Sequence, residues 1–169
     1  MNLHGLKSVQ PPPPNVQSPV LLCGDDAKVA DWIWGHIPDE EQKENSCYTA
    51  IGVAPNGFLI AGVVYCNYMP QFETIQLHIA TDNLSCLDGE TSRELLTYPF
   101  DEIGVYKCLI MIPSDNKKIL QVIDSMKFKR EATLKHHFGE NRHGIIFSML
   151  KPDFQNLYGE DHDQSKNQK

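Results

Sequence analysis

The sequence has no apolar run that approaches the roughly 20 residues of a membrane-spanning helix. Even its longest apolar runs, such as "FLIAGVVYC", end well before that length. It also lacks an opening cationic segment followed by an apolar one, which is the pattern of a secretory signal. These absences predict a soluble protein of the cytoplasm that has no membrane partner.

Cysteine is sparse and irregularly placed. The five cysteines occur at positions 23, 47, 66, 86 and 108, and none forms a CxxC pair. An odd count at wide spacings argues against a disulfide framework and against a zinc ribbon. The seven histidines, including the pair His136–His137, do not have the spacing of metal ligands on a helix, so we predict no metal site. We interpret the cysteines within apolar segments as small core residues.

Positive charge is in deficit, because 15 Lys and Arg stand against 22 Asp and Glu, for a net charge of −7. Binding to nucleic-acid phosphates requires clustered Lys and Arg, so nucleic acid is not expected as a partner. The one cationic segment, "KFKREATLKHH", would alternate its charges between the two faces of a strand. We interpret it as a solvent-exposed strand at the edge of a sheet.

Composition and patterning predict a single domain over residues 20–154. A chain of 169 residues fits one domain with a substantial core. Residues 1–19 contain "PPPP" and are predicted to form an extended arm. Residues 155–169 have few apolar side chains and are predicted to form a polar tail.

The domain is predicted to be α/β, with a mixed sheet of six to seven strands and helices on both faces. The element order is β-α-β-β-β-α-β-α-β-β. The first helix is expected to be capped by Asp25 or Asp26 and to end at Pro38. Asn56-Gly57 between apolar runs predicts a hairpin. The strands "FETIQLHIA" and "VYKCLIMI" are joined through a helix, so they are predicted to be parallel.

The stretch "DNKKILQVIDSMKFKRE" carries the strongest pattern. Its apolar residues fall on one face of a helix: Ile119, Leu120, Val122, Ile123 and Met126. Ser114 or Asp115 is expected to cap this helix, and Phe128 enters the next strand. Together with the element order, this stretch resembles the GNAT superfamily of acyl-CoA-dependent N-acyltransferases, in which an Asn opens such a helix and a Gly-Phe pair opens the following strand. Asn116 and Phe128 occupy these two places.

The resemblance covers residues 20 to 152. The segments "SRELLTYPFDEIGVYKC" and "HGIIFSMLK" are similar to GNAT proteins of proteobacterial and phage genomes. The resemblance implies that acetyl-CoA lies between the fourth and fifth strands, which splay apart. Its pantetheine arm would pair with the backbone of the fourth strand, and its pyrophosphate would lie at the N-terminus of the following helix. The implied cofactor-binding residues are Ile79, Thr81, Gly89, Thr91, Ser92, Arg93 and Asn116. For Asn116, an ordinary role at the helix start is the alternative.

The general base implied by the resemblance is Glu73 or His78, which differ in strand parity and cannot both face one site without a bulge. Each can also be interpreted as a structural residue, exposed at the strand start for Glu73 and half-buried for His78. His136 and His137 are further candidates for the acceptor mouth.

Three positions depart from the family pattern. The phosphate loop "CLDGETSRE" has one glycine and two acidic residues. Ile123 stands where many members have a Tyr that protonates the CoA thiolate, and Lys127 replaces the glycine before Phe128.

Two functions remain open. The first is an N-acetyltransferase that moves acetyl directly from acetyl-CoA to a primary amine, such as a polyamine, an aminoglycoside-like cation or a basic protein terminus. The second is a catalytically inactive GNAT-fold protein that serves as a binding or structural module, for instance in a phage.

Overall fold

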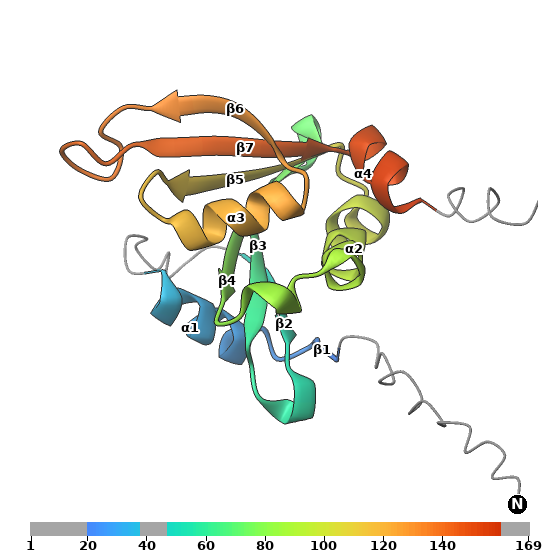
Figure 1. The fold of residues 1–169 in the computed structure, drawn as a ribbon. Helices are drawn as coiled ribbons and strands as arrows, with labels where there is room; N and C mark the ends of the chain where they lie inside the picture. Colours follow the sequence, from blue (N-terminus) through green and yellow to red (C-terminus); the bar gives the residue numbers. More distant parts are fainter. Residues whose placement is uncertain (1–19, 38–46, 160–169) are drawn as a thin grey trace, which may run out of the picture.

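A computed structural model describes residues 20–37 and 47–159. Its centre is a seven-stranded sheet in the order β1-β2-β3-β4-β5-β7-β6 (Figure 1). The strands are β1 Leu21–Leu22, β2 Thr49–Val53, β3 Ala61–Met69, β4 Thr74–Thr81, β5 Lys107–Pro113, β6 Lys129–Leu134 and β7 Gly144–Leu150. The helices are α1 Asp26–His36, α2 Gly89–Thr97, α3 Lys117–Ser125 and α4 Lys151–Tyr158. The expected arm at 1–19 and the segment 160–169 lie outside the described residues.

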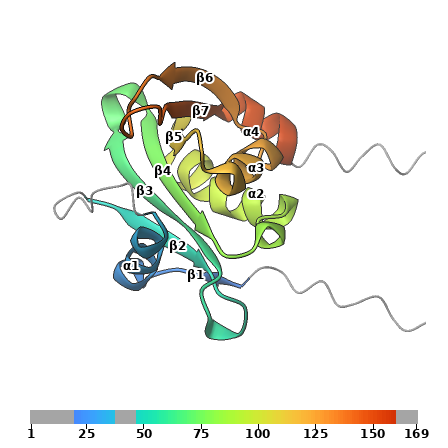
Figure 2. The same ribbon diagram turned by 60° about the vertical axis from the view of Figure 1, so that its left-hand side comes forward.

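The strand pairing confirms the predicted mixed sheet. Strands β1 to β4 form an antiparallel meander, β4 and β5 are parallel, and β5, β7 and β6 are antiparallel. Helix α1 covers one face beside β2 and β3, whereas α2, α3 and α4 lie against the opposite face (Figure 2). None of the helices in the described segments has the length and apolar character of a membrane span.

The turn between β2 and β3 forms as its residues predict. Asn56 and Gly57 have φ of 57° and 82°, within the short helical turn Pro55–Gly57. These two residue types adopt positive φ at low cost, so the turn reverses the chain without strain.

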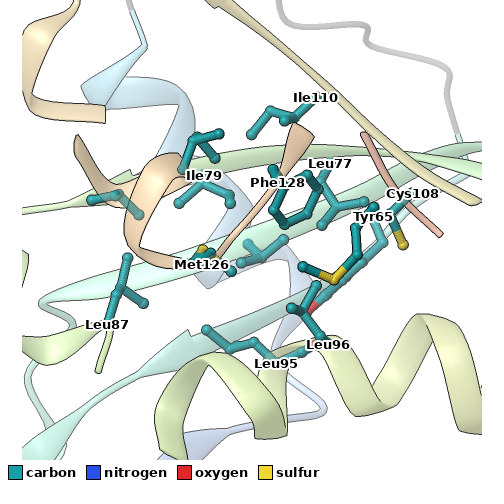
Figure 3. Close-up of a cluster of buried hydrophobic side chains, with 14 of the residues drawn as sticks. Tyr65, Leu77, Ile79, Leu87, Leu95, Leu96, Cys108, Ile110, Met126 and Phe128 are labelled. Carbon is teal, nitrogen blue, oxygen red and sulfur yellow. The ribbon is translucent and has the colours of Figure 1, made fainter. Parts of the chain in front are cut away.

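The larger core lies between the sheet and helices α2 and α3. Alternate residues of β4, namely Ile75, Leu77 and Ile79, are at most 4% exposed and point into it, which confirms their predicted shared face. Ile110 of β5 and Phe128 lie beside Leu77 in this core (Figure 3). Cys66 and Cys108 are also buried, as expected of small core residues.

A pair of glycines lets α1 lie close to the other face. Gly52 and Gly62 are opposite each other on β2 and β3. A Cβ on Gly62 would lie 3.1 Å from Cδ1 of Ile33 in α1, and a Cβ on Gly52 would collide with Leu59. The missing side chains therefore set the depth of α1, and with it the position of Trp34 and Ile37 near its end.

Helix α3 begins and ends differently from the prediction. The N-cap is Asn116, whose Oδ1 accepts a hydrogen bond from the Ile119 N–H at 3.2 Å, so neither Ser114 nor Asp115 caps it. At its end, the Lys127 N–H donates to Asp124 O and the Phe128 N–H donates to Ile123 O. This is the Schellman pattern, which requires a left-handed residue, and Lys127 adopts φ of 65° where a glycine would be unstrained.

The remaining caps and helix ends add three observations. Asp25 is the N-cap residue of α1 but makes no capping bond, and the Asp26 carboxylate instead accepts a hydrogen bond from the Ala50 N–H. Helix α2 is followed directly by a π-helical segment, Tyr98–Ile103, which contains Pro99. Helix α4 reaches Tyr158, four residues past the predicted domain end at 154, because Phe154 packs into the core and Tyr158 packs against it.

The expected edge strand, β6, carries an ion pair with a consequence for pH. Every residue of β6 is exposed, but the Glu131 carboxylate accepts a hydrogen bond from Ser148 at 2.6 Å and lies 2.7 Å from Lys107 Nζ. The hydrogen bond from Lys107, and to a smaller extent the one from Ser148, lowers the pKa of Glu131 below its usual value of 4.5.

We expect the stabilisation by this ion pair to be complete above the pKa that Glu131 has in the unfolded chain. A lowered pKa in the folded state means that this stabilisation is lost as the pH falls through that lower value. The free energy of unfolding of the Glu131→Gln variant should therefore fall less steeply between about pH 5 and pH 3 than that of the parent, measured by urea denaturation. Glu140→Gln, in the β6–β7 turn, is the control; equal slopes for the parent and Glu131→Gln would contradict the prediction.

Candidate active site

The parallel strands β4 and β5 pair over only part of their length. Their ladder comprises Thr74–Lys107, Ile75–Cys108 and Gln76–Leu109, and then ends. Both strands continue, to Thr81 and Pro113, without pairing to each other. We call this unpaired part the splay. Facing backbone N–H and C=O groups there have no ladder partner across the gap, so an extended ligand could supply one.

A cavity of about 20 Å³ lies in the splay. It is lined by Ile37, His78, Ile79, Ile110, Met111, Ile112, Pro113, Asn116 and Ile119. This volume holds about one water molecule. Three of the predicted site residues, His78, Ile79 and Asn116, therefore meet at one place, although they come from β4 and from the start of α3.

His78 is the titratable side chain of β4 at this cavity. It is 7% exposed, and its ring meets Trp34 of α1 edge-on, with 4.9 Å between ring centroids. The next residue, Ile79, points to the opposite face, toward α3. The pleat of β4 thus places an imidazole on the α1 side of the splay and an apolar wall on the other side.

Glu73, the other candidate base, lies at the far end of β4. It has φ of 51° just before the strand begins, and its side chain is exposed. Its carbonyl oxygen accepts hydrogen bonds from the N–H groups of Tyr106 and Lys107. His78 is five positions further along the chain, or about 16 Å along the strand. The structure therefore does not bring the two candidate bases together.

The end of β4 is held by its own side chains. The Thr81 hydroxyl donates to Asn83 O at 2.7 Å and accepts from the Asn83 N–H at 3.1 Å. Thr81 is 4% exposed, so what it offers a ligand at the splay is backbone rather than the hydroxyl. Lys118 Nζ of α3 donates to Asp82 O at 3.0 Å and ties α3 to the same corner.

Gly89, Thr91 and Ser92, predicted in a phosphate loop, form the first turn of α2 instead. The Asp88 carboxylate caps this helix by accepting from the Thr91 N–H at 2.9 Å. Thr91 and Ser92 are buried, and the Ser92 hydroxyl donates to Leu87 O. The helix N-terminus, which favours an anion, therefore already has a carboxylate on it, and Glu90 adds a second acidic side chain to the turn.

Arg93 is not at this helix start. Its side chain lines a groove between α2 and α4 of about 590 Å³, together with Phe154 and Tyr158. Burial raises the pKa of the Tyr158 phenol there. The groove that Arg93 lines does not include Gly89, Thr91 or Ser92, the neighbouring residues predicted to bind the cofactor.

The β6–β7 hairpin is attached next to Asn116. Ser114 N–H donates to His143 O at 2.9 Å, and the Arg142 guanidinium binds the Asp115 carboxylate at 2.8 and 3.1 Å. The hydrogen bond from Arg142 lowers the pKa of Asp115. His136 and His137 lie in the turn of this hairpin, exposed, and neither lines the cavity.

The α3 side of the splay is filled by side chains. Ile123, at the place of the family tyrosine, is fully buried, and Phe128 lies between Leu77 and Ile110 (Figure 3). A thiolate arriving at Ile123 would find no proton donor in that side chain. In the described part of the chain, no three His, Cys, Asp or Glu side chains gather in a way that would hold a metal ion.

Comparison with solved structures identifies the architecture. A chimera of the spermidine N-acetyltransferase SpeG from Vibrio cholerae and hSSAT aligns with a TM-score of 0.66 over 83% of this chain and 100% of that one, at 13% identity. The fold is that of the GNAT acyltransferases. The dodecameric spermidine N-acetyltransferase from Vibrio cholerae, in an intermediate state, aligns with a TM-score of 0.62 at 14% identity, covering 82% and 97% of the two chains.

A probable acetyltransferase also has this GNAT fold, with a TM-score of 0.54 and 18% identity over 73% of this chain and 70% of its own. No family model and no curated protein matches the sequence.

Sequence reasoning missed two residues that shape this candidate site. Trp34 carries no local signal of a role at the site, yet its ring meets His78. Asp88 was interpreted as an acidic loop residue, whereas it caps α2. Asp88 had a local signal, since Asp is one of the residue types preferred at the N-cap position directly before a helix.

Proposed function

We propose that the protein is an N-acyltransferase that transfers an acetyl group from acetyl-CoA to a primary amine in the cytoplasm, or in the host cytoplasm if a phage encodes it. The observation that carries the proposal is the splay. A GNAT sheet whose β4–β5 ladder stops after Gln76–Leu109 has two unpaired strand edges, with the imidazole of His78 between them and α1. This arrangement supports cofactor binding and proton transfer at one place.

The residues of the splay fit acetyl-CoA in part. The unpaired edges of β4, including Ile79 and Thr81, provide backbone groups for a pantetheine arm, and Asn116 lies at the cavity wall. A volume of about 20 Å³ does not hold that arm, so binding requires the splay to open wider than it is in this structure. At α2, the backbone of Gly89 is exposed, whereas Asp88 and Glu90 oppose an anion.

The chemistry needs few groups from the chain. The cofactor supplies the thioester, and a neutral amine attacks its carbonyl carbon. His78 is the side chain that takes the proton from the amine, and backbone N–H groups at the unpaired edge of β4 stabilise the negative oxygen. Ile123 cannot donate a proton to the departing thiolate, so water or the protonated base does.

The acceptor class to test first is a polyamine. Several of the solved neighbours are spermidine N-acetyltransferases, and this chain carries a net charge of −7, which attracts polycations. Acceptors of other classes, such as aminoglycosides and the amino terminus of a basic peptide, belong in the same screen.

Isothermal titration with acetyl-CoA, CoA and desulfo-CoA tests the proposal. We expect saturable one-site binding in the micromolar range, about −8 kcal/mol, followed by CoA release when an accepted amine is added. An absence of both heat and thermal shift at millimolar acetyl-CoA would refute acetyl transfer.

We expect the Asp88→Asn variant to bind acetyl-CoA more tightly than the parent, by about two- to fivefold, because it removes a negative charge at the helix N-terminus. Asparagine caps a helix as well as aspartate, so the thermal stability should not change. Titration of both proteins measures the difference. Glu94→Gln, one turn further along α2, is the matched control, and an affinity for acetyl-CoA that is unchanged or weaker in Asp88→Asn would contradict the prediction.

A catalytically inactive binding module is the second candidate, and two observations favour it. Apolar side chains fill the α3 side of the splay, and a carboxylate occupies the anion-binding end of α2. This candidate predicts no CoA binding by the parent and none by Asp88→Asn, so the same two titrations separate the candidates.

A further inference from the structure

A second and larger cavity lies at the opposite end of β4 from the splay. Its volume is about 430 Å³, within the range of small-ligand sites. It forms where β3 runs past the start of β2, beneath the π-helical segment Tyr98–Ile103. We call it the tyrosine pocket, and it is lined by Cys47, Tyr48, Thr49, Tyr65, Cys66, Asn67, Tyr68, Ile75, Tyr98 and Ile103.

Two tyrosines have their hydroxyls bonded within the fold. The Tyr65 hydroxyl donates to Leu95 O at 2.7 Å, and the Tyr98 hydroxyl donates to Thr49 Oγ1 at 2.9 Å. Their rings are tilted by 58°, with 4.9 Å between centroids. Because these hydroxyls are already satisfied, what Tyr65 and Tyr98 offer the pocket is the surface of their rings.

Tyr48 and Tyr68 add two more rings at the outer part of the lining. Tyr48 is half-buried, and Tyr68 is 47% exposed. Neither hydroxyl has a hydrogen-bond partner within residues 20–37 and 47–159. Tyr65 is only 2% exposed, so the rings that a ligand in the pocket would meet are those of Tyr48, Tyr68 and Tyr98.

The charge around the tyrosine pocket favours a cation. No Lys or Arg is among the described residues that line it, and the Glu102 carboxylate lies on the same π-helical segment as Tyr98 and Ile103. The faces of aromatic rings are themselves negative, so the rings of the lining add to this preference.

We propose that the tyrosine pocket binds a small organic cation of the alkylammonium or quaternary ammonium type, held against its rings. Such cations bind aromatic faces through the ring quadrupole and need no hydrogen-bond donor from the protein. The site is separate from the splay, because Ile75 of the pocket lies where β4 and β5 are still paired. It does not depend on acyl transfer.

Choline is a suitable probe, and 3,3-dimethyl-1-butanol is its neutral isostere. Titration of the full chain, followed by NMR of the tyrosine ring signals, should show saturable binding of choline and at least threefold weaker binding of the isostere. Equal binding of the two compounds, or no saturable binding of choline, would overturn the proposal.

Ring substitutions locate the site. Tyr68→Leu should weaken choline binding by roughly three- to tenfold, whereas Tyr68→Phe, which keeps the ring, should retain it. Tyr106→Leu is the matched control, because Tyr106 is 49% exposed and does not line the pocket. Both tyrosines are at the surface, so the variants should fold. An equal loss of binding in Tyr68→Leu and Tyr106→Leu would place choline elsewhere and overturn the proposal.

Discussion

Replacement of Phe100 by alanine should lower the free energy of unfolding by about 3–5 kcal/mol, because it removes a large buried side chain and leaves a cavity. Phe100 is fully buried, and its ring stacks on Phe154 with 4.8 Å between centroids. Its carbonyl oxygen also accepts a hydrogen bond from Lys151 Nζ at 2.9 Å. The substitution therefore loosens the contact between the π-helical segment and α4. Urea denaturation measures the change.

Phe58→Ala is the control for this substitution. Phe58 is 76% exposed, so its removal should change the free energy of unfolding by no more than about 0.5 kcal/mol. A domain of this size has only about 5–15 kcal/mol of stability in total, so the loss at Phe100 would be a large share of it. Equal effects of the two substitutions would mean that α4 does not contribute to the folded core.

Replacement of His78 by alanine should lower kcat for amine acetylation by roughly 100- to 10,000-fold, the usual contribution of a general base. The expectation rests on the place of His78 at the splay. His78→Gln keeps an amide that can hydrogen-bond but cannot take up a proton, so it should lose as much activity while it retains the fold. Release of CoA, followed with a thiol reagent, gives kcat and KM separately.

Glu73→Gln is the matched control for the His78 substitutions. Its side chain is exposed at the far end of β4, and its carbonyl oxygen rather than its carboxylate makes the structural contacts. Its kcat should stay within about twofold of the parent, as expected for a group that does not take part in proton transfer. A larger loss of activity in Glu73→Gln than in His78→Gln would reverse the assignment of the base. Thermal unfolding of each variant shows whether a loss of activity reflects a loss of fold.

Local patterns predicted most of the fold correctly. The hairpin at Asn56-Gly57 follows from two residues that tolerate positive φ, and the helix at 117–125 follows from its apolar stripe. The parallel pairing of β4 and β5 follows from the helix that joins them. Each of these depends on neighbours in sequence, which is why composition and spacing suffice.

The parts that were missed depend on residues distant in sequence. Helix α4 looks polar, because its only large apolar side chains are Phe154, Leu157 and Tyr158, yet the contact between Phe154 and Phe100 holds it on the core. Its one local signal was Pro152, since proline is common in the first turn of a helix.

The candidate site was harder to predict for the same reason. His78 and Asn116 were named separately, but their shared cavity depends on where the β4–β5 ladder stops, which no local pattern encodes. Arg93 was expected at the phosphate site because it is close in sequence to Gly89. In the structure Arg93 lies in the second turn of α2 and lines the groove beside α4, which its distance in sequence from Gly89 does not reveal.

The two borders of the sheet affect how the protein can assemble. At one border, β1 is only two residues long; at the other, β6 is bulged between Arg130 and Ala132 and carries Lys129 and Arg130 on its exposed surface. Short, twisted or charged borders do not accept a further strand from another molecule. Filaments built by continuous strand addition are therefore disfavoured even in concentrated solution. Stable complexes between copies must instead form through contacts between side chains on the helical and loop surfaces.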